Sequence, residues 1–157
     1  MKIHSYTTLL NENGNPYLKK ANTYDVDGRK KYNSPNRIAE FIYNGLELHK
    51  YAEEYAYVLC FDTAYHLIGC FEISHGTADT TFMGSREIFQ KALMIGATYI
   101  AITHNHPSGD VSPSKADIEA TEKIKAAAKI IGIPLLDHII VGQDRYYTFC
   151  EKSEVRL

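Results

Sequence analysis

The sequence has 157 residues, of which 45% are hydrophobic and 23% are charged, so it is long and apolar enough to form one folded domain. The formal net charge of −2 excludes a chain-wide basic field of the kind that holds nucleic acid by its phosphates. No apolar run approaches the roughly 18 residues of a membrane span, and three widely spaced cysteines favour a cytoplasmic location.

Residues 1–33 are rich in turn signals that divide them into pieces too short for a domain. The dipeptides are Asn13-Gly14, Asn15-Pro16 and Asp27-Gly28. We expect a hairpin or an irregular arm over residues 1–33, followed by a single domain over residues 34–157.

Three helices are predicted from start signals, apolar spacing and glycine stops. Ser34-Pro35 precedes the first, over residues 36–49, and the second runs over residues 85–95 with Gly96 as its stop. Ser112-Pro113 repeats the start signal before the third helix, which ends at Gly132. The expected inward face of that third helix consists of Ile118, Thr121, Ile124, Ala128 and Ile131.

The remaining apolar stretches alternate with these helices and are short, aromatic and β-branched, which is typical of buried strands. The expected strands cover residues 54–61, 67–74, 98–103, 135–141 and 146–150. Because helices and strands alternate along the chain, we predict an α/β fold: a three-layer α/β/α domain with a mixed central sheet.

Two histidines stand at the end of the strand predicted over residues 98–103. His104 and His106 are two residues apart, so on an extended strand both imidazoles project to the same side. Ser114 and Asp117 follow in the first turn of the third helix, where residues three apart share a face. An isolated His-x-His pair is more often two ordinary side chains than a metal site. This longer pattern predicts that His104, His106 and Asp117 bind one metal ion.

Two histidines and one carboxylate leave a fourth tetrahedral position open, which is typical of catalytic Zn2+. Hydrolysis at such a site also needs a proton shuttle, because the attacking water loses a proton and the leaving amine gains one. A nearby carboxylate is therefore expected. Three glutamates compete for this role from the residues alone: Glu53, Glu54 and Glu72.

The run His104-Asn105-His106-Pro107-Ser108-Gly109-Asp110, followed by Pro113-Ser114 and Asp117, resembles a known signature. It is similar to the JAMM zinc motif of the JAB/MPN domain, in its bacterial RadC branch. The resemblance covers residues 36–151 and includes Leu136-Asp137-His138-Ile139-Ile140-Val141-Gly142. It implies the fold of that domain, which is also cytidine-deaminase-like.

The resemblance also implies roles for single residues. It selects Glu54, eight residues before the Asp62 that ends its strand, as the general base. It makes Ser114 the donor to the oxyanion of the transition state, although a serine at this position can also be a helix cap. His138 can orient a metal ligand or be structural, and Arg86 can hold a substrate carboxylate or pair locally; both alternatives stay open.

The predicted function is that of a zinc-dependent hydrolase, a metallopeptidase or isopeptidase acting on a peptide or isopeptide substrate. The alternative is an accessory protein of DNA processing or repair, as the RadC resemblance implies. Near-neutral charge argues against that alternative, and residues 1–33 are too short and turn-rich for the helix-hairpin-helix region with which RadC proteins usually begin.

Overall fold

A computed structural model describes residues 1–76 and 84–156 of the chain. Its regular elements alternate between strands and helices, and a π-helical turn (η1) and a 3-10 turn (η2) extend the first helix. In chain order they are β1 (Lys2–Leu10), β2 (Pro16–Asp25), α1 (Pro35–Phe41), η1 (Ile42–Leu46), η2 (Leu48–Lys50), β3 (Glu54–Phe61), β4 (Leu67–Gly76), α2 (Ser85–Ile95), β5 (Tyr99–Asn105), α3 (Lys115–Ile131), β6 (Leu135–Val141), β7 (Arg145–Thr148) and β8 (Ser153–Arg156).

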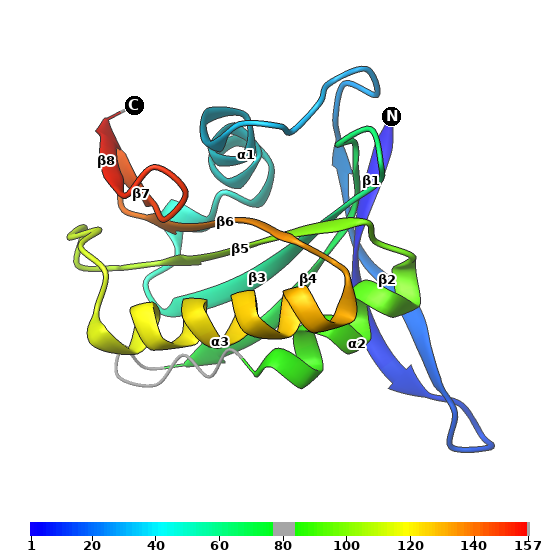
Figure 1. The fold of residues 1–157 in the computed structure, drawn as a ribbon. Helices are drawn as coiled ribbons and strands as arrows, with labels where there is room; N and C mark the ends of the chain where they lie inside the picture. The colour runs from blue at the N-terminus through cyan, green and yellow to red at the C-terminus, as the bar shows by residue number, and fades with distance from the viewer. Residues whose placement is uncertain (77–83, 157) are drawn as a thin grey trace.

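The strands form one mixed sheet in the order β2-β1-β4-β3-β5-β6-β7-β8. β5 runs parallel to β6 and antiparallel to β3. α1 covers one face of this sheet, while α2 and α3 cover the other (Figure 1). The predicted three-layer α/β/α architecture with a mixed central sheet is therefore confirmed.

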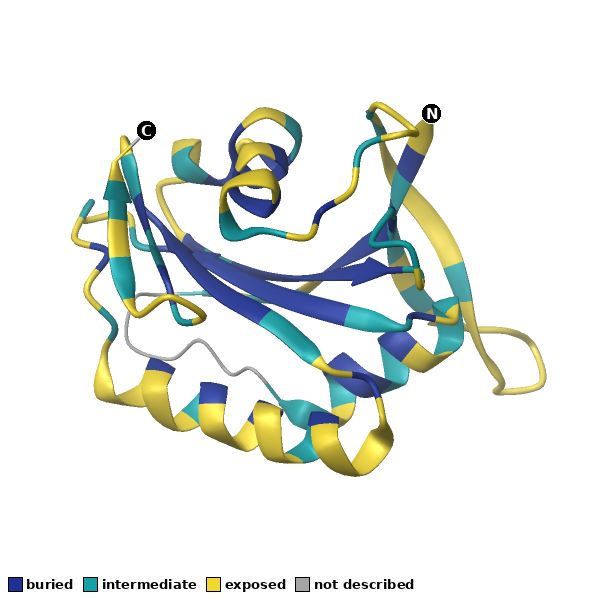
Figure 2. Ribbon diagram, turned by 45° about the horizontal axis from the view of Figure 1, so that its top comes forward, coloured by how far each residue is buried: buried dark blue, intermediate teal, exposed yellow. Residues whose placement is uncertain are grey.

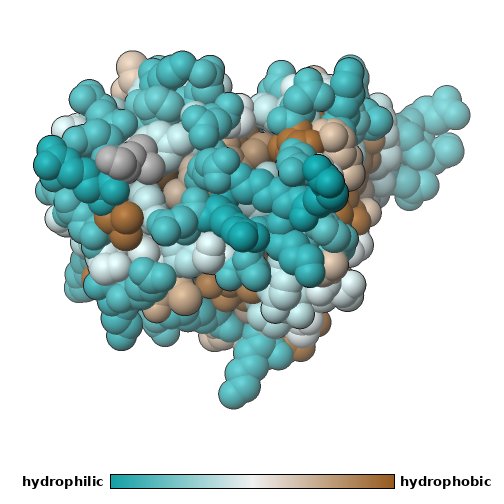
Figure 3. Space-filling view, turned by 90° about the horizontal axis from the view of Figure 1, so that it is seen from above, coloured by the Kyte–Doolittle hydropathy of each residue, from teal (hydrophilic) through white to brown (hydrophobic). Residues whose placement is uncertain are grey.

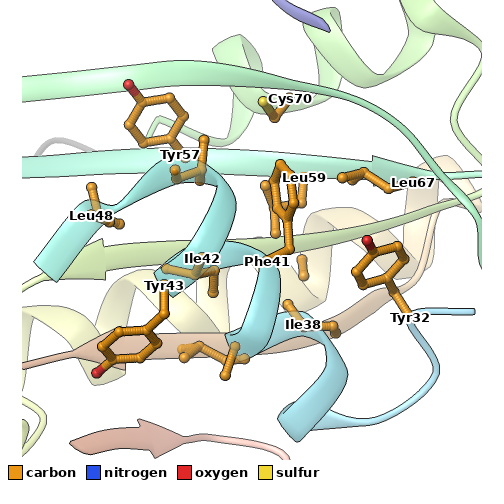
Figure 4. Close-up of a cluster of buried hydrophobic side chains, with 14 of the residues drawn as sticks. Tyr32, Ile38, Phe41, Ile42, Tyr43, Leu48, Tyr57, Leu59, Leu67 and Cys70 are labelled. Atoms are coloured by element: carbon orange, nitrogen blue, oxygen red, sulfur yellow. The ribbon is translucent and has the colours of Figure 1, made fainter. Parts of the chain in front are cut away.

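Side chains of β3 alternate between two hydrophobic clusters, one on each face of the sheet. Tyr57 and Leu59 belong to the cluster beneath α1 and η1, which Figure 4 shows. Ala56 and Val58 belong to the cluster beneath α2 and α3. The central strands are consequently buried on both faces (Figure 2), which is why β3 has the nearly continuous apolar sequence that predicted it.

Residues 1–33 contain the hairpin that was one of the two expected forms. β1 pairs with β2 antiparallel along most of their length, and a single parallel bridge, Ser5 to Cys70, joins β1 to β4. Most of β2 is exposed, and the tip of the hairpin extends away from the body of the protein (Figure 1). The division of the chain at residue 33 stays a prediction.

Two predicted helices differ from the observed ones at their ends. The first was expected to run to residue 49, but its α-helical part ends at Phe41 and Glu47 adopts a left-handed conformation with φ of 51°. The third begins at Lys115 rather than directly after Ser112-Pro113, because Ser114 is its N-cap.

The inward face of α3 is narrower than predicted. Thr121, Ile124 and Ala128 are buried as expected, but Ile118 and Ile131 are 48% and 40% exposed. Asp117 takes the inward position one turn before Thr121, so the next residue along the helix is rotated toward solvent.

Four strands also differ from prediction, and the first of them, β4, ends at Gly76 rather than at residue 74. β5 starts and ends later than expected, so it carries His104 and Asn105 within it, and β7 ends at Thr148 rather than at residue 150. β8 was not predicted, because its four residues carry little apolar signal. Among the described residues, no helix is both long and apolar enough to cross a membrane.

Candidate metal centre

The two histidines enter the site from the carboxyl end of β5. His104 pairs with Ala56 of β3, whose side chain faces α2 and α3, and paired residues of antiparallel strands share a face. His106 lies just beyond the strand, where its backbone N–H donates to the carbonyl of Val141 at the end of β6. Both imidazoles therefore meet on the side of the sheet that α3 covers.

The loop from His106 to α3 is held against the end of β6. A Cβ at Gly142 would lie 2.8 Å from the carbonyl oxygen of Gly109, so only glycine permits this close approach. Val111, in the same loop, is buried. This contact brings the N-terminus of α3 to the histidines.

Asp117 is oriented by a capping box at the start of α3. Its backbone N–H donates to the Ser114 Oγ, and its Oδ2 accepts from the Ser114 backbone N–H at 2.8 Å and hydroxyl at 2.6 Å. The cap role considered for Ser114 is thus observed. Its role as an oxyanion donor stays a prediction. Because Ser114 occupies Oδ2, Oδ1 is the oxygen of Asp117 that faces His104.

The three predicted metal ligands converge on one point. Donor atoms of His104, His106 and Asp117 all lie within 4.8 Å of one another. The two Nε2 atoms are 3.0 Å apart, and the His104 Nε2 is 3.2 Å from Asp117 Oδ1. The His106 Nε2 is 3.6 Å from the other carboxylate oxygen, Asp117 Oδ2. Bonds of 2.0–2.1 Å to a tetrahedral zinc ion imply about 3.3 Å between donors, so these separations are close to those that zinc requires.

The hydrogen bond on the far side of His106 fixes which of its nitrogens can bind a metal. Its Nδ1 lies 2.7 Å from the backbone carbonyl of Asp110, and a carbonyl can only accept. Nδ1 therefore carries a proton, and Nε2 is the nitrogen that faces the site and can bind a metal. Such a backbone partner is typical of histidines that bind metals.

The charges at the site stabilise one another. Burial raises the pKa of Asp117, but hydrogen bonds to His104 and His106 outweigh it and hold this pKa well below its usual range. Burial lowers the pKa of His106, but Asp117 and the carbonyl of Asp110 outweigh it, so this pKa is raised. The site therefore favours an ionised carboxylate beside positive charge.

His138 contacts the centre from β6, on the strand next to His104. Its ring is fully buried, 2.9 Å from His104 Nδ1 through Nε2 and 2.6 Å from the Thr121 hydroxyl through Nδ1. Burial and the neighbouring His104 hold the pKa of His138 well below its usual range, so its imidazole is neutral. Asp137 does not contact the metal centre, because its carboxylate accepts hydrogen bonds from the Thr148 hydroxyl and the Cys150 backbone N–H instead.

Glu54 begins β3 and is 6% exposed. It lies two residues before Ala56, on the same face as His104, and its negative charge raises the pKa of His106. The competing glutamates lie elsewhere: the Glu53 side chain is 61% exposed and contacts His75, and Glu72 is also near His75 at the surface.

Asn105, between the two histidines, is buried and binds the segment that leads into β3. Its Oδ1 accepts from the Tyr55 backbone N–H, and its Nδ2 donates to the carbonyls of Glu53 and Tyr51. These hydrogen bonds hold the backbone on both sides of Glu54. Sequence reasoning did not find this residue, although a polar side chain between two predicted metal ligands is a usable signal.

Arg86 lies at the start of α2, where the sequence placed it, and its role toward substrate stays a prediction. Its side chain is 82% exposed at the start of α2, and Nη1 lies 3.5 Å from the Glu87 carboxylate. The structure thus shows the local pairing that was one of the two alternatives.

Fold and site together define a mixed α/β domain with a buried two-histidine, one-carboxylate centre between a strand end and a helix start. The family model of the RadC-like JAB domain matches residues 32–155. The chain belongs to this family.

Relatives named UPF0758 protein support the assignment. One from Thermotoga maritima is 35% identical over 135 residues, which cover 82% of this chain and 61% of the relative. One from Clostridium botulinum is 42% identical over 123 residues, covering 78% and 53%. One from Methanosarcina barkeri is 34% identical over 138 residues, covering 88% and 59%. The chain spans about half the length of the curated relatives it matches.

Proposed function

We propose that this chain is a zinc-dependent hydrolase that cleaves an amide bond, as a metallopeptidase or isopeptidase. The observation that carries the proposal is the donor triangle of His104, His106 and Asp117, whose spacing suits tetrahedral zinc. Zinc held by three protein ligands lowers the pKa of a bound water to about 7 and polarises the carbonyl under attack.

Glu54 is the proposed general base. It takes the proton of the attacking water on a carboxylate oxygen and later transfers it to the nitrogen of the leaving amine. Its burial at the start of β3, on the face of His104, supports this role. The hydrogen bonds from Asn105 to the backbone on both sides of Glu54 support it as well.

Ser114 is the proposed donor to the oxyanion. Its hydroxyl proton is directed at Asp117 Oδ2, 2.6 Å away, so donation to substrate requires the hydroxyl to turn. A single such donor is worth about 10²–10³-fold in turnover.

Family membership is equally compatible with a DNA-processing role, which stays the alternative. The net charge of −2 supplies no general attraction for phosphates. The face seen in Figure 3 is mostly hydrophilic, with apolar side chains in small separate patches.

The test is cleavage of peptide and isopeptide libraries by zinc-loaded protein, with and without a chelator. We expect a hit that the chelator abolishes and that His104→Ala fails to cleave. His66→Ala is the matched control, because His66 also contacts a carboxylate, that of Asp62, but at the opposite end of β3. Metal-independent cleavage, or equal activity in both variants, contradicts the proposal. Salt-dependent DNA binding that His104→Ala retains supports the alternative.

A further inference from the structure

Three side chains from three elements form a continuous hydrogen-bonded chain behind the metal centre. Thr121 of α3 contacts His138 of β6, and His138 contacts His104 of β5. All three residues are fully buried. Because buried hydrogen-bonding groups are matched donor to acceptor, the direction of each bond can be worked out.

The direction is fixed at the Thr121 end. The Thr121 Oγ1 lies 2.6 Å from the backbone carbonyl oxygen of Asp117, one helical turn earlier. Two oxygens at that separation need a proton between them, and the carbonyl has none to give. The single hydroxyl proton of Thr121 is therefore committed to Asp117.

The remaining protons follow from this commitment. Since the Thr121 oxygen can only accept from His138, an imidazole with a single ring proton carries it on Nδ1. The Nε2 of His138 then has a lone pair and accepts a hydrogen bond from the N–H of His104 Nδ1. His104 is left with its lone pair on Nε2, the atom 3.2 Å from Asp117 Oδ1.

We propose that His138 and Thr121 are positioning residues that fix the tautomer and ring orientation of His104, so that its Nε2 lone pair faces the metal. This inference rests on the metal site of the proposed function. Histidines that bind metals usually donate their second ring nitrogen to a carboxylate, a carbonyl or water. Here the acceptor is a second histidine, and its own tautomer is set by the helix that also supplies Asp117.

The arrangement gives α3 two connections to the ion. Asp117 is itself a ligand, and its backbone carbonyl anchors the chain that orients His104. With His106 Nδ1 bound to the Asp110 carbonyl, the Nε2 atoms of both histidines face each other and Asp117, the arrangement in which they can bind one metal ion.

The chain offers a matched pair of variants for the test. Thr121 and Thr148 are both fully buried, and each hydroxyl donates over 2.6 Å, to the Asp117 carbonyl and to the Asp137 carboxylate respectively. Thr121→Val breaks the chain to His104, whereas Thr148→Val removes an equivalent hydroxyl outside it. Thr121→Ser restores the hydroxyl.

The first measurement is the zinc dissociation constant of each variant, by competition with a chromophoric chelator, with thermal unfolding of the metal-free proteins as the control for folding. We expect Thr121→Val to bind zinc about 10–100-fold more weakly, and Thr148→Val and Thr121→Ser to retain wild-type affinity. Equal zinc affinity in the two valine variants overturns the proposal.

The second measurement needs no variant to fold. Long-range nitrogen–proton NMR of wild-type protein labelled with 15N-histidine reports which ring nitrogen of His138 carries the proton. We expect Nδ1, with or without zinc, and a proton on Nε2 overturns the proposal. If the wild type binds no zinc, the proposed hydrolase fails and the role of His138 toward the metal fails with it. If zinc binds but His138 carries its proton on Nε2, the positioning role is wrong and the proposed hydrolase is not.

Discussion

Ser114 and Asp117 bind each other in both directions at the start of α3. The Asp117 backbone N–H donates to the Ser114 Oγ, and the Ser114 hydroxyl and N–H both donate to Asp117 Oδ2. The same pair therefore caps the helix and turns Oδ1 of the carboxylate toward His104.

Ser114→Ala should lower the free energy of unfolding by about 0.5–2 kcal/mol, as the loss of an N-cap does. Ser112→Ala is the matched control, because Ser112 lies in the loop before the helix rather than at its cap. Chemical denaturation of the metal-free proteins measures both. Equal destabilisation by the two changes would show that the helix starts where the sequence pattern first placed it.

The metal-free protein should be most stable near pH 6.5, because two histidines have pKa values shifted in opposite directions. The pKa of His106 is raised, so its contribution is complete below 6.5 and is lost as the pH rises through the folded-state value. The pKa of His138 is lowered, so its contribution is present above 6.5 and is lost as the pH falls further. Thermal unfolding in a chelator between pH 5 and 8 measures this.

Zinc should change this dependence of stability on pH, because its ligands must be deprotonated to bind. The rise in melting temperature on adding zinc should therefore grow with pH across the histidine range. A zinc-induced rise that is the same at pH 5.5 and pH 7.5 contradicts ligation by histidine.

Asn105→Asp should weaken the hold on the segment that carries Glu54. The substitution keeps an acceptor for the Tyr55 N–H but places an oxygen against the carbonyls of Glu53 and Tyr51. We expect a loss of about 1–3 kcal/mol in the free energy of unfolding, with the zinc content retained. Asn13→Asp, in the exposed turn of the hairpin, is the control and should leave stability unchanged. Loss of zinc in Asn105→Asp would mean that Asn105 acts on the histidines instead.

Much of the fold followed from local signals that tertiary packing does not override. The strand over residues 54–61 was predicted to the residue because both of its faces are buried, and Gly96 ends α2 in a left-handed conformation as expected. The ends of the other helices depended on side-chain contacts that spacing does not report. Ser112-Pro113 and Ser114 carry similar start signals, and only the bond to Asp117 decides between them.

The clustering of His104, His106 and Asp117 could be predicted because a strand end and a helix start each restrict side-chain direction, and their role as metal ligands stays a prediction. The contacts of the residues behind them could not be predicted, because they depend on neighbours distant in sequence, and the sequence left His138 open between orienting a ligand and a structural role. Thr121 was assigned only to the inward face of a helix, and its bond to His138 joins α3 to β6. The structure brings Glu54 to the face of the histidines and leaves Glu53 and Glu72 at the surface, but the role of Glu54 stays a prediction.

Replacing the base and replacing a ligand should have different consequences. Glu54→Gln keeps the size and a polar head but cannot take the proton of water, so zinc should remain while turnover falls by about 10²–10⁴-fold. Asp117→Ala should lose both zinc and turnover. Ser114→Ala should keep zinc and lose about 10²–10³-fold in turnover.

Glu53→Gln is the matched control for Glu54→Gln, because it makes the same chemical change one residue away on a side chain that is 61% exposed. It should keep both zinc and wild-type turnover. The measurements are zinc content by elemental analysis and the rate of cleavage of a chelator-sensitive peptide or isopeptide. If Glu54→Gln cleaves that substrate at the wild-type rate with zinc bound, Glu54 is not the base. If Glu53→Gln is the slow variant instead, the exposed glutamate is the proton acceptor and β3 must rearrange when substrate binds.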